Sequence, residues 1–336
     1  MKHRFDLSQA FLAKAGWGDA CRQFLAGDAS DRSYDRLSQG SKTAVLMDAP
    51  PGRGDDLATF LAIAAHLSAL GLSAPQCYAQ DLEHGFLLLE DLGDNIFATV
   101  LKTAPTLENS LYTAATQVLS HLQSQPAAAN LPNLTAQDWA EAACFALDWY
   151  RFAITGDHTD HADFRNALTD ALSRRADGPR VMILRDYHAE NLLWLPDRPG
   201  LAQVGVLDFQ LAQLGQPGYD LVSLLQDARR DVSRETEAAM IRAFCDQTDT
   251  TADSFCPAYA TLGAQRALRI LGIFARLCLH GGKPSYLALI PRVWQHLQHN
   301  LAAPELAPLA KICAQLLPEP TPEALARIGA QCGHFR

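Results

Sequence analysis

The stretch that most constrains the fold of this chain is VMILRDYHAENLLWL, residues 181–195, followed shortly by VGVLDFQ at residues 204–210. It consists of an apolar run, a compact polar loop, a second apolar run, a turn at PDRPG and a third apolar run. This alternation predicts a strand, a loop and a β-hairpin. Such an arrangement would bring three oxygen-bearing side chains to one end of a small sheet: Asp186, Asn191 and Asp208.

The spacing of Asp186 and Asn191, with four residues between them, is typical of kinase catalytic loops. There the Asp accepts a proton from the attacking hydroxyl and the Asn holds a magnesium ion. Because Mg²⁺ prefers hard oxygen ligands, we predict that Asn191 and Asp208 bind it and that Asp186 is the catalytic base. Asp and Asn are also ordinary turn formers. The motif therefore gains its weight from the strands around it and from the Asp that ends the next strand.

The same segments carry a family resemblance. RDYHAENLL and VLDFQ resemble the catalytic and metal-binding motifs of the aminoglycoside phosphotransferase and choline kinase-like family. Three further segments, GDASDRSYDR (27–36), LMDAPPG (46–52) and GFLLLEDLG (85–93), most resemble the bacterial anomeric kinases of N-acetylmuramate and N-acetylglucosamine. The resemblance extends from about residue 5 to residue 230 of the 336 residues.

The resemblance implies an α+β protein with the two-lobed protein-kinase-like fold. A small β-rich N-lobe would occupy residues 1–92 and a larger, mainly helical C-lobe residues 93–336. It also implies ATP and Mg²⁺, and phosphate transfer to the anomeric hydroxyl of an amino sugar in cell-wall recycling. Two alternatives stay open: an aminoglycoside, choline-like or other small alcohol as the acceptor, and a nucleotide-binding module without transfer activity.

For the nucleotide, the resemblance implies that hinge backbone around Glu90, Asp91 and Leu92 hydrogen-bonds the adenine. The loop at residues 27–33 would cover the phosphates. Its small residues allow backbone N–H groups to approach phosphate, and two side chains, Ser30 and Arg32, would add donors.

The chain departs from the family pattern on the third strand, where Met47 aligns with the lysine that contacts the phosphates in kinases. The following helix, residues 55–70, contains no Glu that would pair with such a lysine. We therefore expect Arg32, Arg36 or another cation to replace the lysine, or else ATP binding to be weak.

Two further positions concern the catalytic loop. Leu184 stands where the family often has His, whereas Arg185 is retained. We predict that Arg185 braces the loop through an acidic partner, for which Asp220 is the candidate. An Asp directly before the apolar run LVSLL is also typical of a helix N-cap, so both roles remain open for Asp220.

Composition sets the outer bounds. A chain of 336 residues with 48% hydrophobic residues is long enough for a large core. Its formal charge of −9 argues against nucleic-acid or anionic-membrane partners, and no feature suggests a protein partner. The eight cysteines show no CxxC spacing, which favours free thiols in a reducing compartment. The absence of a signal-peptide h-region or a membrane-length apolar run favours a soluble, cytoplasmic enzyme.

Periodicity and turn residues predict the elements in order. Strands are expected within residues 25–50 and at 77–81 and 86–90. Helices are expected at residues 7–15, 55–70, 107–124, 135–154, 160–176, 219–230, 234–247, 254–280, 284–300, 304–316 and 321–330. His158 and His161 lie close in sequence. Because the sequence offers no evident third metal ligand, a solvated turn is the favoured interpretation.

Overall fold

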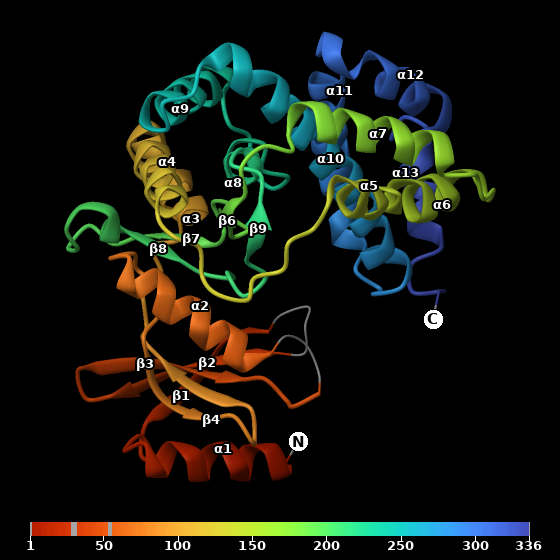
Figure 1. The fold of residues 1–336 in the computed structure, drawn as a ribbon. Helices are drawn as coiled ribbons and strands as arrows, with labels where there is room; N and C mark the ends of the chain where they lie inside the picture. Colours follow the sequence, from red (N-terminus) through yellow and green to blue (C-terminus); the bar gives the residue numbers. More distant parts are fainter. Residues whose placement is uncertain (1, 28–31, 53–55, 336) are drawn as a thin grey trace. The chain divides into compact units, whose positions relative to one another are not determined.

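The computed structural model describes residues 2–27, 32–52 and 56–335 (Figure 1). The chain forms two compact units, Met1–Val118 with Ala189–Ala212, and Leu119–His188 with Gln213–Arg336. The first unit thus contains the two segments 93–118 and 189–212, which the sequence analysis assigned to a C-lobe. The lobe division at residues 92 and 93 stays a prediction.

The first unit is built on a five-stranded antiparallel sheet with the strand order β1-β2-β3-β5-β4. Its strands are β1 (Cys21–Gly27), β2 (Ser33–Gln39), β3 (Lys42–Asp48), β4 (Cys77–Asp81) and β5 (Phe86–Leu89). The predicted strands at 77–81 and 86–90 are confirmed. Strand β1 is an edge strand whose residues are nearly all exposed. Its sequence therefore lacks the apolar alternation that would predict a strand.

One face of this sheet carries helix α1 (Lys2–Lys14). Phe11 and Leu12 of the helix pack in one buried cluster with sheet residues that include Leu46 and Leu88. Since side chains alternate between the two faces of a strand, the neighbouring Val45 and Leu89 point to the opposite face. Figure 1 shows helix α2 (Leu57–Ala69) on that side.

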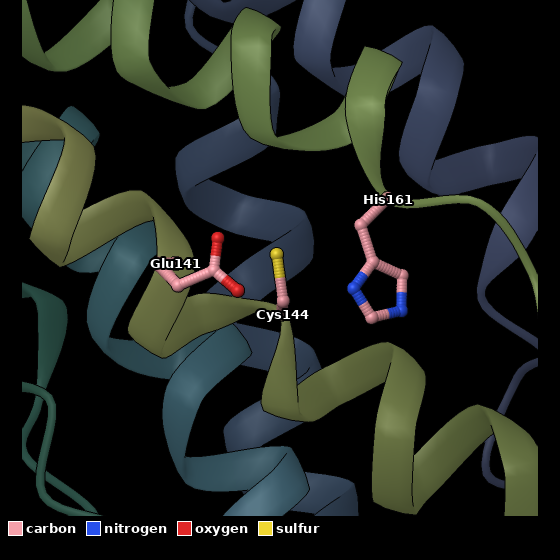
Figure 2. Close-up of side chains that lie close together, drawn as sticks. All are labelled: Glu141, Cys144 and His161. Atoms are coloured by element: carbon pink, nitrogen blue, oxygen red, sulfur yellow. The ribbon is translucent and has the colours of Figure 1, made fainter.

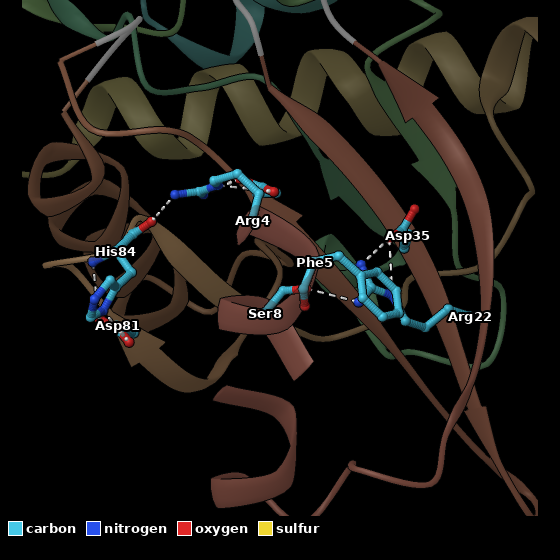
Figure 3. Close-up of polar contacts among 8 residues, drawn as sticks. Arg4, Phe5, Ser8, Arg22, Asp35, Asp81 and His84 are labelled. Atoms are coloured by element: carbon cyan, nitrogen blue, oxygen red, sulfur yellow. Dashed lines mark hydrogen bonds and ion pairs between the residues drawn. The ribbon is translucent and has the colours of Figure 1, made fainter. Parts of the chain in front are cut away.

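Arginines at the rim fasten α1 to the sheet (Figure 3). Arg22 donates to Asp35 at 2.6 Å and to the Ser8 hydroxyl of α1 at 2.9 Å. Arg4 forms an ion pair with Asp48 and donates to the carbonyl oxygen of His84 at 2.6 Å. These contacts tie the first helix to β1, to β3 and to the turn between β4 and β5.

That turn depends on Gly85, which has φ +76°. A Cβ atom there would lie 2.0 Å from the carbonyl oxygen of Ala49. The same close approach forms a hydrogen bond of 2.9 Å from the Ala49 N–H to the Gly85 carbonyl. The turn predicted at EHG is therefore possible only with glycine at its last position.

The first unit continues with α3 (Phe97–Thr103), the start of α4 (Glu108–Ser124) and the hairpin of β7 (Leu192–Trp194) and β8 (Val204–Val206). The hairpin pairs Leu192 with Val206 and Trp194 with Val204. This is the hairpin that the sequence around PDRPG predicted.

The second unit is mainly helical and also contains the short antiparallel pair β6 (Val181–Ile183) and β9 (Gln213–Gly215). Its helices include α5 (Ala136–Ala143), α6 (Phe152–Thr155), α7 (Ala162–Arg175), α8 (Tyr219–Leu225), α9 (Arg234–Gln247), α10 (Ala252–Leu279), α11 (Ile290–Leu301), α12 (Ala307–Leu316) and α13 (Pro322–Ala330). The predicted helix 234–247 matches α9. Among the described residues, no helix is both long and apolar enough to cross a bilayer.

Three predicted helices were too long, and the helix expected at 284–300 begins only at Ile290, after the 3₁₀ segment Pro284–Leu289. The helix expected at 135–154 is interrupted by a π-helical turn at Ala146–Arg151. There α10 approaches so closely that a Cβ atom on Gly272 would lie 2.2 Å from the Phe145 carbonyl. The helix expected at 219–230 ends at Leu225, because the following Gln226 and Asp227 turn inward and are buried.

Candidate active site

The first unit contains a cavity of about 420 Å³, a size typical of small-molecule sites. The cavity is formed by β1, β2, β3, α2, the segment after β5 and the segments flanking the β7–β8 hairpin. Its walls are Leu25, Ala26, Gly27, Tyr34, Val45, Phe60, Pro75, Leu89, Glu90, Asp91, Leu92, Gly93, Asp94, Ile96, Glu190, Asn191, Leu193, Leu207, Asp208, Phe209 and Gln210.

All three predicted hinge residues line this cavity. The Glu90 carboxylate forms an ion pair with Arg198, and the Glu90 N–H donates to the Gln76 carbonyl at 2.8 Å. Asp91 pairs with Arg36 at 2.9 Å. The Leu92 N–H has no acceptor among the described residues. The hinge side chains are thus engaged in structural contacts, which leaves backbone groups for a ligand.

The hairpin brings the two predicted metal ligands together. Asn191 directly precedes β7 and Asp208 lies two residues after β8, and the Leu207 N–H donates to the Asn191 carbonyl at 2.9 Å. As a result, the Asn191 amide nitrogen lies 3.5 Å from Asp208 Oδ2. Gln210 donates to Asp208 Oδ1 at 2.7 Å, a contact that the sequence did not suggest.

This pair fits a magnesium ion by its donor chemistry, because a carboxylate and an amide carbonyl are the hard oxygen donors that Mg²⁺ takes. Asp208 has φ +56°, a conformation that non-glycine residues adopt rarely and often at functional sites. Behind it, Phe209 is fully buried and stacks on Phe60 of α2 with ring centroids 4.9 Å apart. The stack fixes the backbone that carries the carboxylate.

The structure assigns fewer of the residues that were predicted to contact the phosphates of ATP. Ser30 lies outside the described residues. Arg32 is 2% exposed and is absent from the described lining of the cavity. Met47 is fully buried, and Arg36 is paired with Asp91 and with Asp94 at 2.8 Å. No Lys or Arg belongs to that described lining, so the cation that would replace the family's lysine stays unassigned.

The second unit holds the other half of the motif. The Asp186 N–H donates to the Leu184 carbonyl at 3.0 Å across Arg185, which has φ +73°. A hydrogen bond over three residues with such a central φ describes a γ-turn, a rare and strained conformation. The chain therefore turns sharply at Arg185 to present Asp186.

Asp220 stabilises this turn. It is fully buried, and its carboxylate accepts the N–H groups of Leu184 at 2.6 Å and Arg185 at 2.8 Å. Asp220 thus braces Arg185 through the backbone, while the Arg185 guanidinium makes no ion pair within the described residues. The alternative N-cap role is wrong, because Asp220 lies inside α8 and Gly218 occupies the N-cap.

Burial also sets the protonation of this loop. It raises the pKa of Asp220 to about 7, although the two N–H donors act in the opposite direction. Burial, with Arg229 and Arg266 nearby, lowers the pKa of His188 to about 3, so His188 is neutral at physiological pH. The Asp220 carboxyl, whose pKa the nearby Asp186 also raises, is therefore the group of this loop that titrates near neutral pH, whereas the His188 imidazole stays neutral.

The sheet with its hinge, the Asp-x₄-Asn loop and the Asp after the hairpin define the class of this protein, a protein-kinase-like phosphotransferase. A sequence profile of the phosphotransferase enzyme family (APH) matches residues 22–256. The chain belongs to this family, and it is an enzyme of the kinase type.

Two relatives are similar over most of their length. A protein of Caulobacter vibrioides named N-acetylmuramate/N-acetylglucosamine kinase is 39% identical, with 89% of this chain and 93% of the relative covered. A Pseudomonas aeruginosa protein of the same name is 34% identical, with 92% and 93% covered.

Solved structures support the fold alone, because their sequence identities are low. A choline/ethanolamine kinase family protein from Mesorhizobium loti superposes with a TM-score of 0.62 at 15% identity, covering 97% of this chain and 99% of that structure. A microcompartment-associated aminopropanol kinase reaches a TM-score of 0.63 at 13% identity, covering 91% and 99%.

Proposed function

We propose that this enzyme transfers the γ-phosphate of ATP to the anomeric hydroxyl of N-acetylmuramate or N-acetylglucosamine, giving the sugar 1-phosphate. The observation that carries the proposal is the name shared by two relatives that are 39% and 34% identical over about nine tenths of the chain. The retained residues Asp186, Asn191 and Asp208 support it.

In this proposal Asp186 orients the sugar hydroxyl and accepts its proton as the bond to phosphorus forms. Transfer of phosphate is governed by positioning and charge stabilisation. The γ-turn at Arg185 would serve the reaction by positioning Asp186. A Mg²⁺ ion held by Asn191 and Asp208 would neutralise charge on the phosphates. Arg185 supports the loop and has no assigned contact with substrate.

For ATP, we propose that the adenine lies in the cavity of the first unit against Val45, Leu89 and Leu193, with the Leu92 N–H as a hydrogen-bond donor. These apolar side chains line the cavity. The Leu92 N–H has no acceptor within the described residues and could therefore donate to the adenine. The predicted phosphate contacts of Ser30 and Arg32 remain part of the proposal. We place the enzyme in the cytoplasm, because ATP and a recycled sugar would both be present there.

The test is phosphate transfer from Mg-ATP to a panel of N-acetylmuramate, N-acetylglucosamine, an aminoglycoside and choline, with products identified by phosphorus NMR. We expect a sugar 1-phosphate, abolished by Asp186→Asn and by Asp208→Asn. Asp170→Asn is the matched control, because within the described part of the chain Asp170 forms only an exposed helical pair with Arg174.

The panel also separates the alternatives. Phosphorylation of only the aminoglycoside or choline would keep the mechanism and exclude the proposed acceptor. ATP binding without transfer to any acceptor would favour a non-catalytic nucleotide-binding protein. The observation favouring that second candidate is Met47, which is fully buried at the position expected for lysine.

A further inference from the structure

Three side chains of different chemistry converge in the second unit, and the proposed function assigns none of them a role. Glu141 and Cys144 lie one helical turn apart at the end of α5, and His161 stands at the N-cap of α7. Ligand atoms of these three residues all lie within 4.8 Å of one another. Figure 2 shows the carboxylate, the thiol and one ring nitrogen turned toward each other.

The two histidines lie in the irregular segment between α6 and α7, as the solvated-turn interpretation expected, and His158 is exposed. His158 stacks on Phe152 with ring centroids 4.5 Å apart. His161, in contrast, finds the ligand partners that the sequence did not reveal. They were missed because Glu141 and Cys144 are 20 and 17 residues away in the chain and become neighbours only when α5 packs against α7.

Two charged side chains orient the cluster from outside. His161 Nε2 lies 3.2 Å from Asp148 Oδ1, so the other ring nitrogen, Nδ1, is left for a ligand. Arg165 donates to Glu141 Oε2 at 2.9 Å, which leaves Oε1. A carboxylate on the far nitrogen of a histidine is the usual outer contact of a metal-bound imidazole.

We propose that Glu141, Cys144 and His161 bind a Zn²⁺ ion that fastens α5 to α7. One thiolate, one imidazole and one carboxylate are the ligand types of zinc, whereas Mg²⁺ and Ca²⁺ take oxygen ligands. Ligand atoms around tetrahedral zinc lie roughly 3.5 Å apart, given zinc–ligand bonds of about 2.0–2.3 Å. Side-chain rotations that move the ligand atoms by about an ångström would close the present cluster around the ion.

The charges agree with a divalent ion. With zinc bound, the Glu141 carboxylate and the Cys144 thiolate balance the two positive charges, and Asp148 balances Arg165. Three protein ligands leave a fourth position for water. The Cys144 side chain is 1% exposed, so the ion would sit against the helix pair. Its role would be to hold the two helices together, and zinc would raise stability by binding only the folded state.

The experiment uses the full chain, treated with a chelator and then titrated with Co²⁺ and Zn²⁺ in excess Mg²⁺ without nucleotide. We expect one equivalent of Co²⁺ to produce tetrahedral d–d bands and a thiolate-to-cobalt charge-transfer band. Zn²⁺ should displace the cobalt and raise the melting temperature, and Mg²⁺ should not compete.

Variants assign the ligands. Cys144→Ser and His161→Gln should each weaken Zn²⁺ binding at least tenfold and abolish the melting-temperature rise, and Cys144→Ser should remove the charge-transfer band. Asp148→Asn should weaken binding about 10- to 100-fold, as outer contacts do. The matched controls are His158→Gln in the same turn and Cys313→Ser, another buried free cysteine, which should bind zinc like the wild type.

The proposal is overturned if Zn²⁺ binds with unchanged affinity to both ligand variants, or if the cobalt complex lacks the thiolate band. Absence of one-to-one binding to the wild type would also overturn it. If Cys144→Ser does not fold, His161→Gln keeps the test decisive, because this side chain is partly exposed. None of these measurements depends on kinase activity, so failure here and failure of the proposed function are distinguishable.

Discussion

Asp220 offers the sharpest test of how the catalytic loop is held. Its carboxylate accepts two backbone N–H groups, from Leu184 at 2.6 Å and Arg185 at 2.8 Å. Asp220→Asn keeps the volume but leaves one acceptor oxygen, so one buried N–H would face the new NH₂ group. An orphaned buried donor costs about 1–3 kcal/mol. A strained residue such as Arg185 costs about the same, so the γ-turn would be free to relax.

If that free energy is lost from the positioning of Asp186, kcat should fall roughly 5- to 150-fold. The KM for ATP should change little, because the cavity belongs to the first unit. Steady-state kinetics with saturating acceptor, together with urea unfolding, would measure both quantities, and Asp170→Asn is the control. A folded Asp220→Asn enzyme with wild-type kcat, or one changed only in KM for ATP, would refute the bracing argument.

Further predictions concern stability. Phe60→Ala should cost about 3–5 kcal/mol and weaken ATP binding, because the ring supports Phe209; calorimetry would measure both. Gly85→Ala should cost at least about 2 kcal/mol in urea unfolding, whereas Gly71→Ala, with similar φ and open space, should cost about 1 kcal/mol. Burial lowers the pKa of His296 to about 4, so the unfolded chain binds more protons between pH 4 and about 6.5, and acidification destabilises the fold. His296→Gln should remove about 1.4 kcal/mol per pH unit of that loss; parallel curves for both proteins would contradict it.

The hairpin that carries the two predicted metal ligands is local in sequence, and for that reason it was predictable. The hairpin between residues 192 and 206 joins neighbouring segments, so turn residues and apolar runs were enough to bring Asn191 to Asp208. In this hairpin the decisive contacts form between residues fewer than 20 positions apart.

Contacts between distant segments were not predictable in this way. Asp220 lies 36 residues from Leu184 and resembles an N-cap in sequence. The ion pair of Glu90 with Arg198 spans 108 residues, and no sequence pattern around either residue predicts it. The π-helical turn at Ala146–Arg151 reflects packing against α10 rather than local propensity. A single sequence shows the residue types of such contacts but not their partners.

The cavity, which is the proposed nucleotide site, has an unusual charge for that role. Its described lining contains five carboxylates, Glu90, Asp91, Asp94, Glu190 and Asp208, and neither Lys nor Arg. Arg198 pairs with the first of these and Arg36 with the next two. Because the described lining carries carboxylates and no cationic side chain, it favours a divalent cation over bare phosphate.

It follows that ATP should bind chiefly as its magnesium complex. In kinases with a third-strand lysine, that ammonium group attracts the phosphates directly, whereas Met47 contributes no charge. We expect the Kd for ATP to rise at least tenfold when Mg²⁺ is replaced by a chelator, a change of about 1.4 kcal/mol or more. Adenosine, which has no phosphates, should bind equally with and without Mg²⁺. Equal ATP affinity in both conditions would show that a cationic side chain of the protein binds the phosphates in place of the lysine. Arg32 would be the first candidate.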